Sequence, residues 1–255
     1  MQDSMFSLDG QVVLITGCRR GIGLAMADAL AEAGADIIGL STSLSPDCSD
    51  VADAVRRHGR QFWGYRCNLG DRAAVDTVLD QVLDDHPAID VLVNNAGVVH
   101  RAPAEEHCDA FWDTVLEVNL SAAFRVSRRI GTTMLALGKG SIISTASVLS
   151  HQGGLRVAAY AASKAGLANL TRSLANEWAG RGVRVNAIAP GYVETDMTAA
   201  LRSDPLRNRQ ILERIPAGRF GSPDDLRGPV VFLASDASRY VHGETLVVDG
   251  GWMGR

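Results

Sequence analysis

The stretch QVVLITGCRRGIG, residues 11–23, joins a short apolar run to a glycine-rich turn. QVVLIT (11–16) has the length and composition of a buried strand, and the next residues, 21–35, carry apolar side chains at helical spacing. Three glycines in the turn allow sharp bending and leave backbone N–H groups open to an anion at the helix N-terminus: Gly17, Gly21 and Gly23. A strand, a glycine turn and a helix in this order favour a dinucleotide-binding loop over a plain turn.

The alternation of strand-length and helical stretches continues along the chain. Further strands are predicted at 36–41, 61–69, 89–97, 140–147, 182–190 and 244–251, and further helices at 51–59, 72–86, 110–137 and 157–180. Strands that alternate with helices of this length imply right-handed crossovers and a parallel sheet. We therefore predict an α/β fold with one Rossmann-type, doubly wound parallel sheet of about seven strands and helices on both faces.

The chain is expected to form a single dinucleotide-binding and catalytic domain over residues 1–255. Its length and its hydrophobic content of 46% allow a sizeable core. One polar stretch, at about 192–221, interrupts the alternation and carries several arginines. We interpret this stretch as an insertion that covers the active site.

Composition excludes several classes of function. A net charge of −4 and a pI near 5.9 do not suggest a nucleic acid or an anionic membrane as partner. No apolar run approaches the length of a membrane span, and the N-terminal MQDSMFSLDG lacks the pattern of a signal peptide. The four cysteines, Cys18, Cys48, Cys67 and Cys108, form no CxxC pair, so we expect reduced thiols, no metal site and a cytoplasmic location.

Tyr160 and Lys164 stand four residues apart in AAYAASKAG (158–166). Such pairs are common on helices and usually have no chemical role. A free tyrosine has a pKa near 10 and is a poor base at neutral pH, but an ammonium on the same helix face lowers that pKa. The pair therefore has the residue types that a proton transfer to or from an alcohol requires.

Ser147 ends the strand predicted at 140–147, thirteen residues before Tyr160. It either caps a turn or bonds a substrate oxygen. Ser144 and Thr145 are nearby alternatives, and strand alternation favours Ser147.

Five motifs in order resemble those of the short-chain dehydrogenase/reductase family. They are TGxxxGIG (16–23), NNAG (94–97), Ser147, Tyr160-xxx-Lys164 and the PG pair at 190–191. The resemblance implies hydride transfer between a substrate carbon and a nicotinamide, with Tyr160 as acid or base, Lys164 beside it and Ser147 as a clamp on the substrate oxygen. It also implies that Asn119 holds a water molecule linking Lys164 to solvent, and that the chain forms a homotetramer.

The same resemblance assigns the cofactor contacts and leaves the choice of cofactor open. The implied residues are Gly17, Arg19, Arg20, Gly21, Ile22, Gly23, Ser41, Asn68, Leu69, Asn95, Ala96, Gly97, Tyr160, Lys164, Pro190, Gly191, Val193 and Thr195, the last of these on the nicotinamide carboxamide. Ser41 stands where a carboxylate would select NAD, and Arg20 stands where NADP-preferring members often carry a basic residue, so NADP is expected to be tolerated or favoured. Asn68 replaces an aspartate that often touches the adenine.

Arginines near the predicted site suggest a carboxylate on the substrate. Arg101 follows the NNAG motif, Arg156 precedes Tyr160 by one helical turn, and Arg219 lies at the end of the polar insertion. The segments FSLDG, HQGGLRV, NEWA, IPAGR and VDGGWMGR resemble a subgroup of sugar-acid dehydrogenases, those acting on 2-dehydro-3-deoxygluconate or 2-deoxygluconate, whose members favour NAD. A sugar acid such as a deoxygluconate derivative is the expected substrate. The alternatives are a ketoacyl or general carbonyl reductase and, more remotely, a non-catalytic cofactor-sensing regulator.

Overall fold

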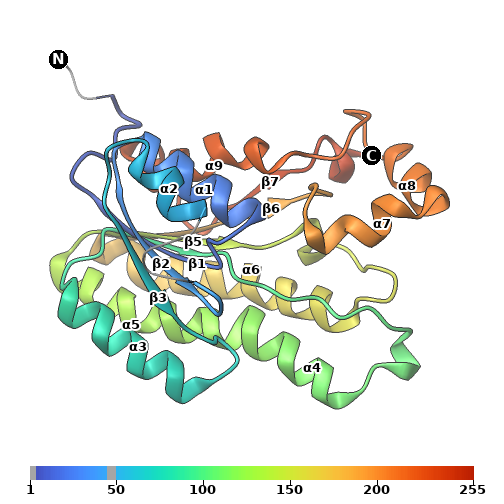
Figure 1. Ribbon diagram of the computed structural model, residues 1–255, viewed down its shortest axis with the longest axis horizontal. Coiled ribbons are helices and arrows are strands. Elements are labelled where there is room, and N and C mark those ends of the chain that lie inside the picture. Colours follow the sequence, from blue (N-terminus) through green and yellow to red (C-terminus); the bar gives the residue numbers. More distant parts are fainter. Residues whose placement is uncertain (1–3, 45–49) are drawn as a thin grey trace.

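The computed structural model of the chain describes residues 4–44 and 50–255. Its strands form one parallel sheet in the order β3-β2-β1-β4-β5-β6-β7 (Figure 1). The strands are β1 Val12–Thr16, β2 Asp36–Ser41, β3 Phe62–Arg66, β4 Val91–Asn94, β5 Gly140–Thr145, β6 Val183–Pro190 and β7 Thr245–Val248. The predicted doubly wound parallel sheet of about seven strands is confirmed.

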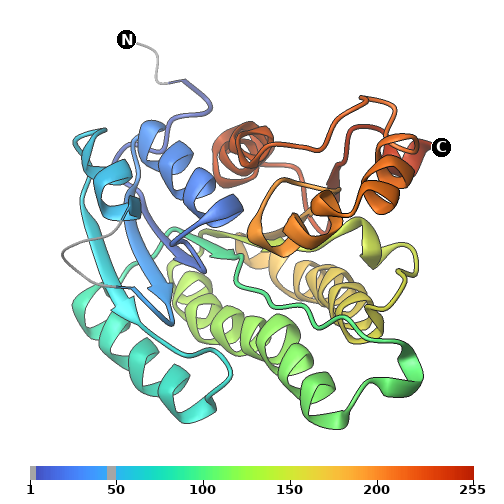
Figure 2. The same ribbon diagram turned by 45° about the vertical axis from the view of Figure 1, so that its right-hand side comes forward.

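Helices cover both faces of the sheet (Figures 1 and 2). One face carries three helices that pack on one another: α1 Gly21–Glu32, α2 Asp50–Arg56 and α9 Arg227–Ala234. The other face carries α3 Arg72–Asp85, α5 Ala122–Leu137 and α6 Ala158–Trp178, and α4 Asp109–Leu116 packs on α6. No helix in the described ranges combines the length and the apolar character that a membrane crossing needs.

Successive strand residues point to opposite faces and so build two separate cores. Val13 and Ile15 pack under α1 and α9, whereas Leu14 between them joins the core under α3 and α5. Leu92 and Val93 divide in the same way. A strand buried on both faces must be apolar at every position, which explains the continuous apolar runs in the sequence.

Some predicted boundaries were too long. The strand predicted at 61–69 ends at Arg66, and the strand predicted at 89–97 ends at Asn94. In each case the next three residues, 67–69 and 95–97, leave the sheet and line a cavity. The helix predicted over 110–137 begins at Asp109 and contains a π-helical turn, Glu117–Ser121, between α4 and α5. Spacing of apolar residues does not reveal such a turn, because the helix continues on both sides of it.

The polar insertion folds mainly as two short helices, α7 Ala199–Ser203 and α8 Pro205–Leu212. Figure 1 shows them on the right of the molecule, near the C-terminus and to one side of the labelled strands. Ile211, Ile215 and Phe220 anchor the insertion in a small apolar cluster with Val148 and Trp252. The insertion is thus fastened to the body of the protein on its apolar side.

Candidate active site

A cavity of about 750 Å³ lies at the carboxyl ends of β1, β4, β5 and β6. This volume is within the range of small-molecule sites. The strand order reverses between β1 and β4, because β2 and β3 extend from one side and β5 to β7 from the other. Ligands of open α/β sheets bind in the crevice at this reversal.

The glycine-rich loop forms one wall of the cavity. Gly17 and Gly21 have positive φ angles of 67° and 56°, which favour glycine. A Cβ atom on Gly23 would lie 2.2 Å from the carbonyl oxygen of Gly17, so this position accepts only glycine. Helix α1 begins after Arg20, whose side chain does not cap it, and its first N–H groups therefore remain available to an anion. This cradle fits the pyrophosphate of a dinucleotide cofactor.

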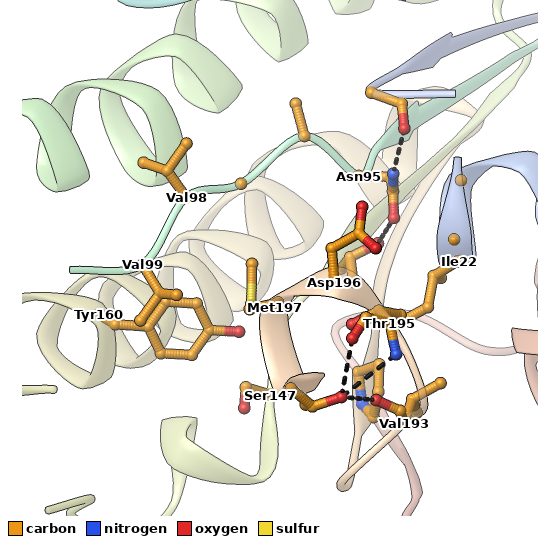
Figure 3. A pocket seen from close by; sticks show the side chains of 18 of the residues that line it. Ile22, Asn95, Val98, Val99, Ser147, Tyr160, Val193, Thr195, Asp196 and Met197 are labelled. Atoms are coloured by element: carbon orange, nitrogen blue, oxygen red, sulfur yellow. Dashed lines mark hydrogen bonds between the residues drawn. The ribbon is translucent and has the colours of Figure 1, made fainter. Parts of the chain in front are cut away.

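The NNAG motif fastens this loop to the central strands (Figure 3). The amide nitrogen of the Asn95 side chain donates to the carbonyl oxygens of Thr16 and Gly17 at 3.2 and 3.0 Å. The backbone nitrogens of Asn95 and Ala96 both donate to the Thr16 hydroxyl, at 3.0 and 3.1 Å. Asn95 thus holds the glycine-rich loop at a set distance from β4.

Helix α6 brings Tyr160 and Lys164 to the cavity. Figure 3 shows the Tyr160 hydroxyl pointing into the cavity toward Met197, with Ser147 facing the same space. The Lys164 Nζ lies 5.7 Å from the centroid of the Tyr160 ring and donates to the Thr145 carbonyl oxygen at 2.6 Å. This bond anchors the ammonium beside the phenol.

Burial and neighbouring charges set the ionisation of this group. Burial lowers the pKa of Lys164 to about 8. Burial also raises the pKa of Tyr160, while a hydrogen bond with Ser147 and the positive charge of Arg101 lower that pKa. The pKa of Tyr160 is raised overall, because burial outweighs the two neighbours that favour the phenolate.

Ser147 shows both of the expected features. Its hydroxyl accepts a hydrogen bond from the Leu149 nitrogen at 3.1 Å and so caps the short turn Val148–Ser150. It also bonds Tyr160 and lines the cavity. Of the two alternatives, Thr145 lines the cavity and bonds the Asn95 side chain at 3.3 Å, and Ser144 is buried away from it.

Asn119 lies in the π-helical turn and is 1% exposed. Its side-chain oxygen accepts from the Val98 nitrogen at 2.8 Å, and its nitrogen donates to the Val98 carbonyl oxygen at 2.9 Å and the Ser163 hydroxyl at 3.1 Å. These bonds tie the loop after β4 to α6. Asn119 does not itself line the cavity, and its role in a water relay stays a prediction.

The residues predicted to hold the cofactor gather at this one cavity. Those that line it are Gly17, Arg19, Arg20, Gly21, Ile22, Gly23, Ser41, Asn68, Leu69, Asn95, Ala96, Gly97, Tyr160, Lys164, Pro190, Gly191, Val193 and Thr195. The three described cysteines, Cys18, Cys67 and Cys108, are free thiols, and Cys48 lies outside the described residues.

The arginines separate into two groups. Arg101 lines the cavity, as expected, but Arg156 and Arg219 do not. Arg156 is exposed with a φ angle of 62°, so it belongs to an irregular loop and not to the helix turn before Tyr160. Arg219 forms a bidentate ion pair with Asp225, at 2.7 and 3.0 Å.

Two arginines missed in the sequence, Arg202 and Arg207, line the cavity from the insertion. The only available signal was the number of arginines in that polar stretch. Which of them would face the cavity depends on how α7 and α8 are placed.

Comparisons with known proteins agree with this geometry. The family model described as enoyl-(acyl carrier protein) reductase matches residues 17–253. The chain belongs to the short-chain dehydrogenase/reductase family. It is accordingly an NAD(P)-dependent oxidoreductase that acts on CH–OH groups.

Two relatives of known sequence show how similar the members are. The 2-dehydro-3-deoxy-D-gluconate 5-dehydrogenase of Pseudoalteromonas atlantica is 58% identical over 250 residues, which cover 98% of each chain. A 3-oxoacyl-(acyl-carrier-protein) reductase of Salmonella typhimurium is 40% identical, over 96% of this chain and 98% of the other.

Two solved structures are also similar. A putative NAD(P)-dependent gluconate 5-dehydrogenase from Beutenbergia cavernae with bound NADP has a TM-score of 0.94 and 50% identity, covering 99% of this chain and 100% of the other. A gluconate 5-dehydrogenase from Burkholderia cenocepacia in complex with NADP and tartrate has a TM-score of 0.93 and 39% identity, over 98% of both chains.

Proposed function

We propose that this oxidoreductase interconverts a secondary alcohol and a ketone on a sugar acid such as a deoxygluconate derivative. The observation that carries the proposal is the position of Arg101, which lines the cavity and whose charge acts on Tyr160. A guanidinium beside the reacting hydroxyl suits a polar, anionic substrate. The relatives named as gluconate and 2-dehydro-3-deoxygluconate dehydrogenases support the same substrate class.

The chain's own residues would move the proton. Tyr160 takes the proton from the alcohol, or gives it to the carbonyl oxygen in the reverse direction. Ser147 would hold the substrate oxygen, and the Lys164 ammonium would stand beside the phenolate as it forms. When bound, the nicotinamide cofactor accepts or supplies the hydride. Asn119 is proposed to hold the water molecule through which the proton reaches solvent.

For the cofactor, we propose that NADP is accepted at least as well as NAD. Ser41 ends β2 at the cavity, so no carboxylate at this position repels a 2′-phosphate. Arg20 lines the same cavity, where it pairs with Asp196 and would have to leave that partner to bind the 2′-phosphate. The structures with bound NADP support this proposal. The sequence also predicts a preference for NAD from the subgroup resemblance, but the similar structures named above contain NADP and not NAD.

We also propose that residues 1–255 form a single catalytic domain, in a homotetramer that works in the cytoplasm. Free thiols at the three described cysteines are typical of a reducing compartment. Exposed apolar side chains that an assembly would cover include Phe111, Phe124 and Val247. Sedimentation measurements would give the oligomeric state.

Reduction of a ketoacyl thioester is a second candidate, favoured by the 40% identical 3-oxoacyl reductase. It would need a groove for an apolar chain, whereas Arg101, Arg202 and Arg207 make this cavity cationic.

One experiment separates the two candidates. The absorbance of reduced nicotinamide would be followed with sugar acids, simple ketones and acyl thioesters, each with NAD(H) and NADP(H). We expect kcat/KM to be highest for a sugar acid. A thioester or a neutral ketone as the best substrate would overturn the proposal.

A further inference from the structure

We propose that Arg202 and Arg207 form a subsite for the substrate's carboxylate, separate from Arg101 at the reacting end. This inference rests on the proposed sugar-acid activity and deepens it. Both side chains are half-buried and line the cavity from the insertion. The Nε atom of Arg202 is buried and has no hydrogen-bond partner in the described structure. A buried donor without a partner is costly, so the protein itself does not satisfy the Arg202 guanidinium.

The corner between α7 and α8 holds the two arginines in a defined arrangement. A side-chain oxygen of Asp204 accepts from the backbone nitrogens of Leu206 and Arg207 at 2.9 and 3.1 Å, which caps α8. The Asn208 side chain donates to the Arg202 carbonyl oxygen at 2.9 Å. Because these bonds join α7 to α8, they fix the distance between the backbone of Arg202 and the backbone of Arg207.

The arginines at this end of the cavity also lack anionic partners. Arg207 donates to the Gln210 side chain at 2.7 Å, and Arg101 donates to the Met197 carbonyl oxygen at 3.0 Å. Both acceptors are neutral. Among the described residues, no ion pair involves Arg101, Arg202 or Arg207. A concentration of positive charge without a protein counter-ion indicates an anionic ligand.

Electrostatic effects link the arginines to the reacting tyrosine. The charge of Arg101 acts on Tyr160, and the charge of Arg207 acts on Arg101 and lowers its pKa, after the larger effect of burial. Tyr160, Arg101, Arg202 and Arg207 all line this one cavity.

A carboxylate subsite apart from the reacting end suits a long hydroxy acid. A 5-dehydrogenase of a gluconate derivative oxidises carbon 5, while the carboxylate is carbon 1, so the two groups are four carbon–carbon bonds apart. A carboxylate held by Arg202 and Arg207 would place the remote hydroxyl at Tyr160.

The test compares Arg207→Gln and Arg202→Gln with Arg209→Gln, a control on the exposed side of α8 whose partner is Glu213. Each variant would be assayed with the best sugar acid and with the same sugar as its neutral amide. For the first two variants we expect KM for the acid to rise about tenfold or more, with kcat little changed. KM for the amide and for the cofactor should stay within about twofold, and tartrate should inhibit these variants more weakly.

The possible results distinguish a failure of the carboxylate subsite from a failure of the proposed sugar-acid activity. If wild type uses sugar acids and the Arg207 and Arg202 variants keep the wild-type KM for the acid, the subsite is wrong and the proposed function stands. Equal losses with acid and amide would also overturn the subsite, because they indicate a structural effect and not recognition of charge. If wild type turns over no sugar acid, both proposals fail.

Discussion

The Arg20 guanidinium lies 2.6 Å from the Asp196 carboxylate and so joins the glycine-rich loop to the insertion across the cavity. Their side chains are 69% and 73% exposed. Ion pairs this exposed contribute little to stability, because water screens them. The pair is more important for the cofactor: Asp196 occupies the guanidinium that would otherwise be free for a 2′-phosphate.

Removal of the Asp196 charge should therefore change the choice of cofactor. For Asp196→Asn we expect kcat/KM with NADP to rise several-fold relative to kcat/KM with NAD. The freed Arg20 guanidinium could then form one charge-assisted hydrogen bond with the 2′-phosphate. For Arg20→Gln we expect the opposite shift. Steady-state kinetics with both cofactors measure the ratio, and the melting temperature should stay within about 2 °C in both variants. An unchanged ratio in both would exclude Arg20 from cofactor selection.

Tyr160→Phe removes the proposed proton donor without changing the ring. We expect kcat to fall by about two to four orders of magnitude, while the cofactor dissociation constant stays the same. Tyr65→Phe is the matched control, since its hydroxyl bonds Asp85 at 2.7 Å away from the cavity. Fluorescence titration of the cofactor and single-turnover kinetics provide the two readouts. Substantial turnover by Tyr160→Phe would refute its role.

The buried Lys164 should make stability depend on pH in a defined window. Its pKa is about 8 in the folded protein and 10.5 when unperturbed. Between these values the unfolded chain binds more protons, so this group makes the free energy of unfolding rise with pH. Below pH 8 its burial penalty is fully present.

Lys164→Met should lack that contribution. Urea unfolding of both proteins at pH 8 and near pH 10.5 would give the difference in free energy of unfolding. We expect wild type to gain stability relative to the variant across this interval. A constant difference would mean that Lys164 is charged throughout.

The glycine-rich loop should tolerate no side chain at Gly23. A Cβ atom there would collide with the Gly17 carbonyl oxygen, so Gly23→Ala must displace the loop. We expect a loss of ~1–3 kcal/mol in stability and a large loss of cofactor affinity. Gly180→Ala is the control, because a Cβ there meets nothing within 4 Å. Equal cofactor affinity in both variants would show that the loop does not bind the cofactor.

Much of the architecture could be predicted because it depends on local patterns. Strands buried on both faces need continuous apolar runs, and the helices between them show their spacing directly. Gly17, Tyr160 and Lys164 were recognisable for a similar reason, since a turn and a helical spacing of four are set by the nearby chain. The π-helical turn at Asn119 was missed, as it leaves the surrounding pattern unchanged.

The arginines show where local reasoning stops. The spacing predicts Arg156 one helical turn before Tyr160, but the chain there is not helical and Arg156 is exposed. Arg219 pairs with Asp225 and does not line the cavity. Arg202 and Arg207, which the sequence did not single out, line it instead.

The sequence by itself determined the alternation of strands and helices, the glycine-rich loop and the Tyr160–Lys164 pair, because each follows from residues close together in the chain. Only the tertiary structure decided which charges share the cavity. Arg20 and Asp196 are separated by most of the chain, and Arg101 and Arg207 by more than a third of it, so the interactions within each pair depend on how the insertion packs over the sheet. No local spacing encodes that packing, so the reacting groups could be recognised in the sequence, whereas the roles proposed for Asp196, Arg202 and Arg207 required the fold.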